Sequence, residues 1–321
     1  MKRFMLRGTL SMLLAFAVVV PAKAQQGRLP ENVDGKAVEI WSDGTKLAGN
    51  LFWPKDKADE KLPAIVLCHG WGGVKQHLNS TYGPFFAAAG FRVLTFDYRG
   101  WGESDSRMVL VGTAPKPDAN GHASVEVQMI REVVDPFDEL EDIQSALDWL
   151  VGEPGIDTDK IGLWGTSFGG GLVLWTATHD SRVKCLVSQV GAVDGQTNLT
   201  PEMLKTFTEA RTKRARGELP PVPQGEDVAE GLRGTPYMSK FIKYRPVDFS
   251  DQLSVPILII DAEKEELFDI KKHGGLVYEK VKDRVPAKYH IEPGITHYGI
   301  YRERYQQGAA LARDWFVEHL K

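Results

Sequence analysis

Apolar residues along this chain are concentrated in short unbroken runs, which polar or glycine-rich segments separate. A continuous apolar run of a few residues is typical of a strand that is buried on both faces of a parallel sheet. The stretches that follow this pattern are Pro63–His69, Phe91–Asp97, Lys160–Trp164, Val183–Val190, Val255–Ile260 and Lys288–Glu292. Before them, the stretch Val38–Trp53 predicts an antiparallel strand pair that turns at Asp43-Gly44.

Stretches that predict helices lie between these strands. The clearest begins at Asp135-Pro136, and its apolar residues from Leu140 to Leu150 fall on one face. The other predicted helices cover Asn79–Ala89, Phe168–Thr178 and Tyr301–Leu320. Because strands and helices alternate, we expect an α/β fold in which a mostly parallel, twisted sheet carries helices on both faces.

Two long segments interrupt this alternation. Residues 99–134 predict a long polar connection. Residues between Gly191 and Val255 include a predicted helix from Thr200 to about Arg216 and a short second helix over Tyr237–Phe241. A structureless loop of that length is uncommon in a compact domain. We therefore interpret residues 194–250, approximately, as a cap insertion after the sixth strand, over the active-site edge.

The first 24 residues have the features of a secretory signal peptide. A basic start precedes the apolar run Leu10–Val20, which is too short to span a bilayer, and Ala22-Lys23-Ala24 is typical of a cleavage site. We therefore expect residues 25–321 to form the mature domain. We also expect this domain to be secreted or periplasmic and to keep no stable membrane anchor.

Charge and cysteine content narrow the possible partners. Without the basic residues of the predicted leader, 35 Lys and Arg remain against 43 Asp and Glu, a net charge of −8. An acidic chain without a basic stripe argues against a nucleic-acid partner. The only cysteines, Cys68 and Cys185, lie in predicted strands that another strand should separate. We therefore expect two buried thiols rather than a disulfide.

The candidate nucleophile lies in the segment Lys160–Gly171. Gly165-Thr-Ser167-Phe-Gly169 fits the pattern G-x-S-x-G between a predicted strand and a predicted helix. In this context the glycines permit a sharp turn that presents the serine hydroxyl, and the helix start offers N–H groups to a developing negative charge. We predict that Ser167 is a nucleophile, with a plain glycine-rich turn as the alternative.

A serine nucleophile requires a base and an orienting acid beyond the carboxyl ends of the parallel strands. His297 follows the last predicted strand, where a neutral imidazole can accept the serine proton and return it to the leaving group. The acid should follow the strand Val255–Ile260, and we favour Glu265 there. The alternatives that stay open are Glu266, Asp261 and Asp269.

The oxyanion hole requires two main-chain N–H groups. We expect them from Phe168, which follows the nucleophile, and from Trp71 in the loop His69-Gly-Trp-Gly-Gly73. Tyr298 is a candidate wall of the substrate pocket. The remaining histidines show no pair with convincing zinc spacing. Those interpreted as surface or helix positions are His77, His122, His179, His273 and His319. A serine mechanism needs neither a metal nor an organic cofactor, so we expect none.

The motifs, taken in order, resemble those of the α/β-hydrolase superfamily over about residues 38–320. They are H-G-W-G-G at 69–73, F-D-Y-R-G-W-G-E-S at 96–104, G-T-S-F-G-G at 165–170 and G-I-T-H at 294–297. The branch looks like the dienelactone-hydrolase-like and acyl-peptidase-like serine esterases. Two departures stand out: Ser167 replaces the cysteine of true dienelactone hydrolases, and Glu265 aligns with the Asp of many members.

Residues and resemblance together predict an exported serine hydrolase. It would cleave a small-molecule carboxylic ester through a Ser-His-acid triad and an acyl-enzyme intermediate. A peptidase or an acyltransferase with the same triad is an alternative within enzymes. A binding protein that keeps this fold without catalysis is the alternative outside them.

Overall fold

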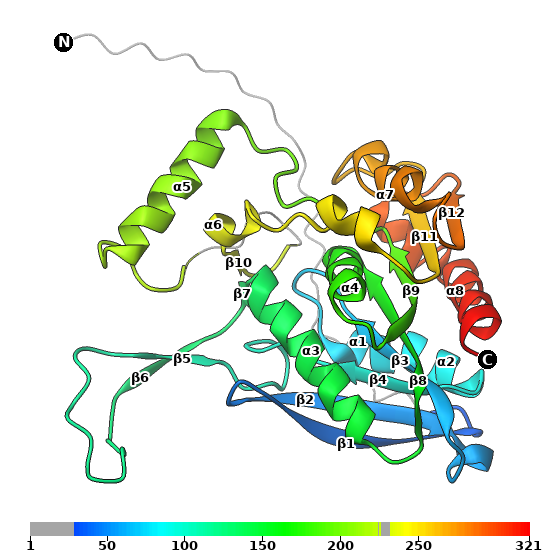
Figure 1. The fold of residues 1–321 in the computed structure, drawn as a ribbon, viewed down its shortest axis with the longest axis horizontal. Helices are drawn as coiled ribbons and strands as arrows, with labels where there is room; N and C mark the ends of the chain where they lie inside the picture. Colours follow the sequence, from blue (N-terminus) through cyan, green and yellow to red (C-terminus); the bar gives the residue numbers. More distant parts are fainter. Residues whose placement is uncertain (1–28, 224, 226–231) are drawn as a thin grey trace, which may run out of the picture.

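An eight-stranded sheet organises the part of the chain that a computed structural model describes, residues 29–223, 225 and 232–321 (Figure 1). Its strands, in spatial order, are β1 (Val33–Ser42), β2 (Thr45–Pro54), β4 (Arg92–Phe96), β3 (Leu62–Cys68), β8 (Ile156–Thr166), β9 (Val183–Gln189), β11 (Ile257–Ala262) and β12 (Ala287–Glu292). Only β1–β2 and β2–β4 pair antiparallel within this sheet. The predicted α/β class with a mostly parallel sheet is confirmed. The predicted signal peptide, residues 1–24, lies outside the described residues.

Local sequence explains the first turn and the central strands. Asp43 and Gly44 join β1 to β2 with φ angles of 44° and 78°, the backbone of a two-residue hairpin turn that favours Asp-Gly. Every residue of β3 is buried, as expected for a strand between two parallel neighbours that is covered on both faces.

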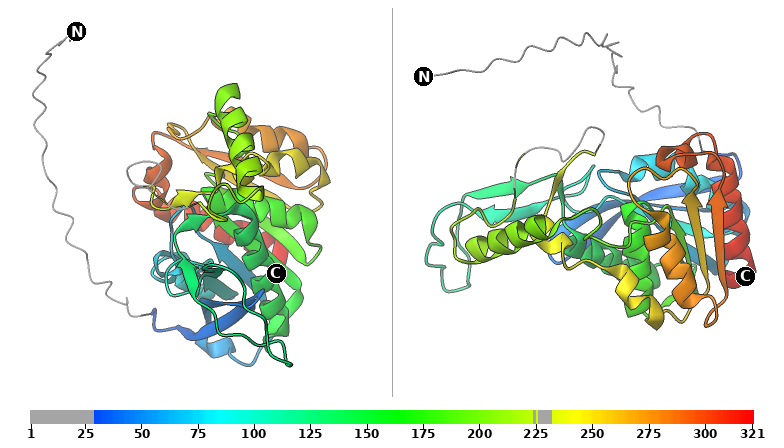
Figure 2. Two further views of the ribbon diagram at one scale, coloured as in Figure 1. Left: turned by 90° about the vertical axis from the view of Figure 1, so that its left-hand side faces the viewer. Right: turned by 90° about the horizontal axis from the view of Figure 1, so that it is seen from above.

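Helices cover both faces of the sheet (Figures 1 and 2). One core contains residues of α3 (Pro136–Gly152), α4 (Phe168–His179) and α7 (Gly274–Val281). The other contains residues of α1 (Lys75–Asn79), α2 (Tyr82–Ala88) and α8 (Tyr305–Leu320). Asp135 caps α3, because its carboxylate accepts from the N–H groups of Phe137 and Asp138.

Two predicted helices have different limits in the structure. The helix predicted over Asn79–Ala89 is present but shorter, since α1 ends at Asn79 and α2 begins only at Tyr82. Pro84 explains the later start, because proline is tolerated in a first turn and not in a helix interior. The last helix begins at Tyr305 rather than Tyr301, because residues 297–301 form a separate 3-10 helix, η4 (His297–Tyr301).

The segment 99–134 is more structured than a polar connection. It contains β5 (Arg107–Leu110) and β6 (Val127–Ile130), which form a two-stranded antiparallel ribbon that projects from the body (Figure 1). It also contains β7 (Val133–Val134), which pairs with β10 (Thr235–Pro236). The strands are short, and the residues that link β5 to β6 include two Gly, two Pro and one Asn, so the apolar pattern is too brief to predict a ribbon.

The predicted cap segment divides into two parts. Helix α5 (Pro201–Ala215) has no buried residue and extends from the body on the side of the ribbon (Figure 1). Later residues, in α6 (Met238–Phe241) and in the 3-10 helix η2 (Pro246–Gln252), return to the body, where Phe241 packs against Phe168 with ring centroids 5.2 Å apart. The remaining 3-10 helices are η1 (Lys55–Lys57) and η3 (Ile270–Lys272).

The cysteines lie as predicted. Cys68 on β3 and Cys185 on β9 are free and buried, and β8 lies between their strands. Burial raises the pKa of the Cys68 thiol to about 12. None of the described helices is both long and apolar enough to cross a bilayer.

Candidate active site

Ser167 occupies a strained turn between β8 and α4. Its φ of 55° and ψ of −123° lie outside the regions that non-glycine residues ordinarily adopt. The glycines on either side permit this turn: a Cβ at Gly165 would overlap the carbonyl oxygen of Gly169, and one at Gly169 would overlap the carbonyl oxygens of Cys68 and His69. The turn therefore requires glycine at both positions and brings Ser167 close to the end of β3.

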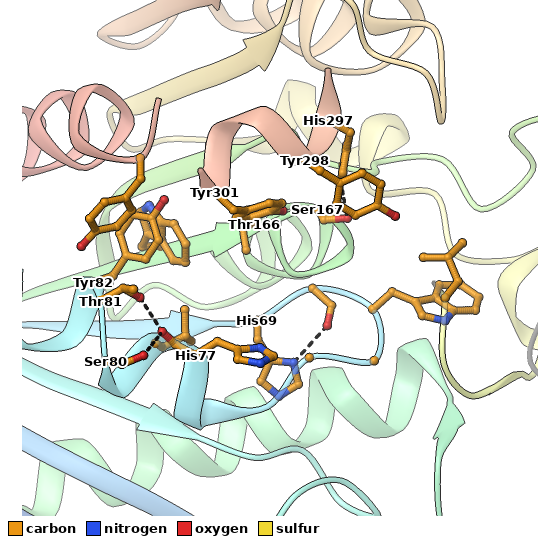
Figure 3. Close-up of a pocket in the computed structure, with 18 of the residues that line it drawn as sticks. His69, His77, Ser80, Thr81, Tyr82, Thr166, Ser167, His297, Tyr298 and Tyr301 are labelled. Atoms are coloured by element: carbon orange, nitrogen blue, oxygen red, sulfur yellow. Dashed lines mark hydrogen bonds between the residues drawn. The ribbon is translucent and has the colours of Figure 1, made fainter. Parts of the chain in front are cut away.

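A chain of hydrogen bonds joins Ser167 to His297 and Glu265; Figure 3 shows the first two of these residues at the cavity. His297 Nε2 lies 3.0 Å from Ser167 Oγ, and His297 Nδ1 lies 2.8 Å from Glu265 Oε2. An ionised carboxylate only accepts, so Nδ1 carries the hydrogen and Nε2 accepts from the serine hydroxyl. The side chains of His297 and Glu265 are each 2% exposed, which strengthens their electrostatic interaction.

The loop after β11 holds the loop after β12 in place. Glu265 accepts from the Leu267 N–H through its second oxygen, at 3.0 Å. Glu266 accepts from the main-chain N–H of His297 at 2.7 Å. Of the other two acids, Asp261 accepts from the Tyr289 hydroxyl and Asp269 accepts from the Lys271 N–H. Among the four candidates, Glu265 is thus the one that contacts the imidazole.

The loop His69–Gly73 lies directly against the serine. A Cβ at Gly70 would lie 2.9 Å from Ser167 Cβ, so only glycine permits this approach. The N–H groups of Trp71 and Phe168 donate no hydrogen bond to another residue that the structure describes. Both donors are therefore available to a ligand beside Ser167.

Comparisons with known proteins agree with this architecture. Residues 63–244 match the family model of the alpha/beta hydrolase fold. An uncharacterized 31.7 kDa Escherichia coli protein from the traX-finO intergenic region is 30% identical over 288 residues, which cover 81% of this chain and 92% of that protein. The chain belongs to the α/β-hydrolase fold family.

Two further proteins resemble this α/β hydrolase. Thiohydrolase aneE of Aspergillus aculeatus is 29% identical over 187 residues, 56% of this chain and 51% of that protein. The crystal structure of the hypothetical protein PA2218 from Pseudomonas aeruginosa has a TM-score of 0.71 at 22% identity, covering 97% of this chain and all of that one. Family and relatives support hydrolase activity and hence an enzyme.

A cavity of about 470 Å³ opens beside the serine of this α/β hydrolase (Figure 3). Tyr298, the predicted pocket residue, lines it next to His297 and is 39% exposed. Burial, and then the charges of Glu266 and Glu265, raise the pKa of Tyr298. Most of the other large side chains on the cavity are aromatic: Trp71, Tyr82, Trp164, Tyr301 and Tyr305.

One histidine of this α/β hydrolase differs from the prediction of surface or helix positions. His273 is 2% exposed: its Nδ1 accepts from the Val193 N–H at 3.1 Å, and its Nε2 lies 2.7 Å from Thr197 Oγ1. It joins the loop after β9 to η3, and burial lowers its pKa. His77 is an exposed residue of α1, as predicted, and it also lines the cavity. No group of three or more potential metal ligands occurs among the described residues.

Other polar residues near the serine escaped sequence analysis. Thr166 and Tyr301 line the cavity, and Gln189 lies buried behind Thr166, with its Nε2 3.2 Å from Thr166 Oγ1. Tyr301 follows His297 by four residues, a spacing that suggests proximity once His297 is chosen. No local signal marks Gln189, which ends an ordinary apolar strand.

Proposed function

We propose that this α/β hydrolase is an exported serine hydrolase that cleaves small-molecule carboxylic esters. The observation that carries the proposal is the continuous hydrogen-bond chain from Glu265 through His297 to Ser167, at the wall of a cavity. This order of acid, base and nucleophile is what an activated serine requires. The free N–H groups of Trp71 and Phe168 beside it support an oxyanion hole.

The proposed reaction has two halves. Ser167 Oγ attacks the ester carbonyl carbon while His297 Nε2 takes the serine proton, and the N–H groups of Trp71 and Phe168 bind the oxyanion. When the tetrahedral intermediate collapses, the C–O bond to the alcohol breaks and His297 protonates the leaving oxygen. Water then attacks the acyl-enzyme with His297 as base, and the acid leaves as Ser167 regains its proton. Glu265 orients the imidazole and stabilises its charged form throughout.

The shape of the cavity supports an apolar group on the substrate. Its aromatic walls at Tyr82, Trp164 and Tyr305 bury apolar surface well, and its volume is in the range of small-molecule sites. We therefore propose that esters with an aromatic or medium-length aliphatic acyl group react faster than acetate esters.

The test uses mature protein, residues 25–321, with p-nitrophenyl esters of increasing acyl length and a fluorophosphonate probe. We expect ester hydrolysis, and a single probe adduct on Ser167 in mass spectrometry that His297→Ala removes. Ser167→Ala should abolish hydrolysis, whereas Ser106→Ala, which changes a buried hydroxyl outside the site, should retain it. Wild-type esterase activity in Ser167→Ala would refute the mechanism, and folded protein without an adduct would favour the binding-protein alternative.

Acyl transfer or thioester cleavage is the second candidate, which the likeness to the thiohydrolase favours. Both reactions use the same acyl-enzyme as ester hydrolysis. Thioester cleavage differs from it in the leaving group, and acyl transfer differs from it in the acceptor. A higher kcat/KM for an acyl thioester than for the matched oxygen ester would favour thioester cleavage. An ester product formed with an added alcohol would favour transfer. Export is tested separately, by N-terminal sequencing of protein expressed from the full chain, with Gln25 as the expected first residue.

A further inference from the structure

A buried chain of polar side chains reaches the serine from the side of the cavity and has no part in the scheme above. Gln189 is fully buried, and its amide nitrogen lies 3.2 Å from both the Tyr82 hydroxyl and Thr166 Oγ1. Thr166 Oγ1 lies 2.7 Å from the Tyr301 hydroxyl. Tyr301 and Ser167 both line the cavity. Figure 3 shows Thr166 and Tyr301 side by side next to Ser167.

The direction of each hydrogen bond follows from counting donors. The amide nitrogen of Gln189 can only donate, so Thr166 Oγ1 accepts from it. Thr166 then has one hydrogen of its own, and the Tyr301 oxygen is the acceptor that the structure places within reach of it. If Thr166 donates to Tyr301, the Tyr301 hydroxyl still has a hydrogen to donate, and Ser167 lies next to Tyr301 on the cavity wall (Figure 3). This arrangement gives the hydroxyl hydrogens of Thr166 and Tyr301 an acceptor each, as buried polar groups require.

We propose that Tyr301 is a further catalytic residue, whose hydroxyl donates a hydrogen bond to Ser167 Oγ and stabilises the negative charge that develops there. Thr166 and Gln189 are positioning residues that aim this hydroxyl. The inference rests on the proposed serine mechanism, because it concerns the same oxygen.

Charge develops on Ser167 Oγ in both halves of the reaction. In acylation the O–H bond breaks toward His297 as the bond to the carbonyl carbon forms. In deacylation the bond from Oγ to the acyl carbon breaks, Oγ keeps the electron pair, and His297 returns the proton. A donor fixed beside Oγ stabilises this oxygen at each stage without reorganisation. Burial raises the pKa of Tyr301, so this side chain stays protonated and remains a donor.

A purely structural role for Tyr301 predicts different results. Its ring also contacts the ring of His297, with centroids 6.1 Å apart, and it forms part of the cavity wall. Loss of packing would lower the melting temperature, and loss of a substrate contact would raise KM. Loss of a donor to Oγ instead lowers kcat and the rate of reaction with a probe that needs only the serine oxygen. Tyr301→Phe separates these effects, because it removes the hydroxyl and keeps the ring.

The experiment measures kcat and KM with p-nitrophenyl butyrate, the rate of fluorophosphonate labelling, and the melting temperature. For Tyr301→Phe we expect kcat and the labelling rate to fall by about tenfold, with KM within about twofold. Tyr278→Phe, a matched loss of a tyrosine hydroxyl away from the cavity, should leave all three unchanged. A second pair of variants tests whether Thr166 orients the Tyr301 hydroxyl. Thr166→Val should lower kcat, whereas Thr166→Ser should retain it. In the double variant, Thr166→Val should cause no loss of kcat beyond that of Tyr301→Phe alone.

The outcomes separate the two proposals. Wild-type kcat and labelling rate in Tyr301→Phe, or a change in KM alone, would overturn the role of Tyr301 and leave the serine mechanism standing. If Tyr301→Phe does not fold, equal kcat in Thr166→Val and wild type would overturn it instead. Activity that persists in Ser167→Ala would overturn the serine mechanism itself, and the inference with it.

Discussion

Two adjacent carboxylates have different roles at His297. Glu265 accepts from the imidazole and fixes which ring nitrogen carries the hydrogen, whereas Glu266 accepts from the main-chain N–H of the same residue. The first interaction acts on the chemistry of the ring, and the second acts on the position of the loop. Substitution of each residue by its amide should therefore produce effects of different size.

Glu265→Gln should lower kcat by about 100-fold or more, because an amide nitrogen facing Nδ1 favours the wrong tautomer and cannot stabilise the imidazolium. Glu266→Gln should lower kcat by less than about tenfold, because its amide oxygen still accepts from the N–H. Steady-state hydrolysis of one ester measures both. A larger loss in Glu266→Gln than in Glu265→Gln would assign the orienting acid to Glu266.

Asp261 makes stability depend on pH. Burial raises its pKa to about 7 from an ordinary 3.8, the hydrogen bond from Tyr289 opposes this, and the charge of Glu265 adds to it. A carboxyl with a raised pKa holds its proton more tightly in the folded state, so its stabilisation is complete below about pH 4 and is lost as the pH rises through 7.

Asp261→Asn keeps a neutral side chain at every pH and should remove this loss. The difference in stability between the variant and the wild type should therefore change in favour of the variant by roughly 1 kcal/mol or more from pH 5 to pH 8. Thermal unfolding by circular dichroism across pH 5 to 8 measures the difference. Parallel profiles for the two proteins would show that Asp261 does not titrate in this range.

Single residues also show where sequence analysis stops. Ser167 and His297 were predictable because each follows a strand at a position that a turn exposes. Glu265 was harder to separate from its neighbours, because several acids follow β11 within a few residues and only the path of the loop decides which one faces the ring. Tyr301 and Gln189 are both hydrogen-bonded to Thr166 only because the fold places η4 and the end of β9 beside the end of β8.

At the scale of elements, the junction of β8 and α4 packs closely against the end of β3. Gly169 lies in the first turn of α4, directly against the carbonyl oxygens that end β3. Contact between these backbones holds the loop His69–Gly73 beside Ser167. The packing of one element on another therefore determines the distance between the nucleophile and its proposed oxyanion donors.

Gly169→Ala should destabilise this junction although alanine favours helices. The helix preference gains about 1 kcal/mol, and overlap with two main-chain oxygens costs more, about 3 kcal/mol. We expect a melting temperature about 5 °C lower and a clearly reduced kcat. Gly152→Ala is the matched control in α3, where a Cβ meets nothing within 4 Å, and it should be neutral or slightly stabilising. Equal melting temperatures in the two variants would refute the packing argument.

Elements with buried sides were predictable, and exposed ones were not. The apolar runs of β3, β4 and β9 mark strands that the core requires, so their positions were predicted to within a few residues. The ribbon β5–β6 has few buried residues, and no long apolar run was needed to form it. Hydrophobic pattern therefore reports burial and misses elements that project into solvent.

At the scale of the whole molecule, one edge of the sheet collects the chemistry. The proposed nucleophile, base, acid and oxyanion loop follow β8, β12, β11 and β3, and all four strands run in the same direction. Alternating strands and helices predict this convergence, because parallel strands end at one edge. The positions of α5 and the ribbon relative to that edge follow from no sequence pattern, since neither contributes to the core.

The ribbon β5–β6 allows a test of whether the rest of the molecule depends on it for stability and activity. Met108 pairs with Met129 and Leu110 with Val127, so four exposed apolar side chains share one face of it. Residues 111–126 form the tip of the ribbon. Their main-chain hydrogen bonds join residues within the tip, as between Val111 and Glu126. We therefore expect the tip to contribute little to the stability of the sheet or to the site.

Replacement of residues 111–126 by Asn-Gly would join Leu110 to Val127, an opposed pair, by a two-residue turn that suits the twist of a ribbon. A shorter connection also costs less entropy to close. We expect the melting temperature to stay the same or rise slightly and kcat to remain within about twofold. A glycine-serine segment of the original length is the control that separates loss of length from loss of contacts. If both variants fold and both lose activity, the tip must take part in binding the substrate, and the body alone would not be sufficient for catalysis.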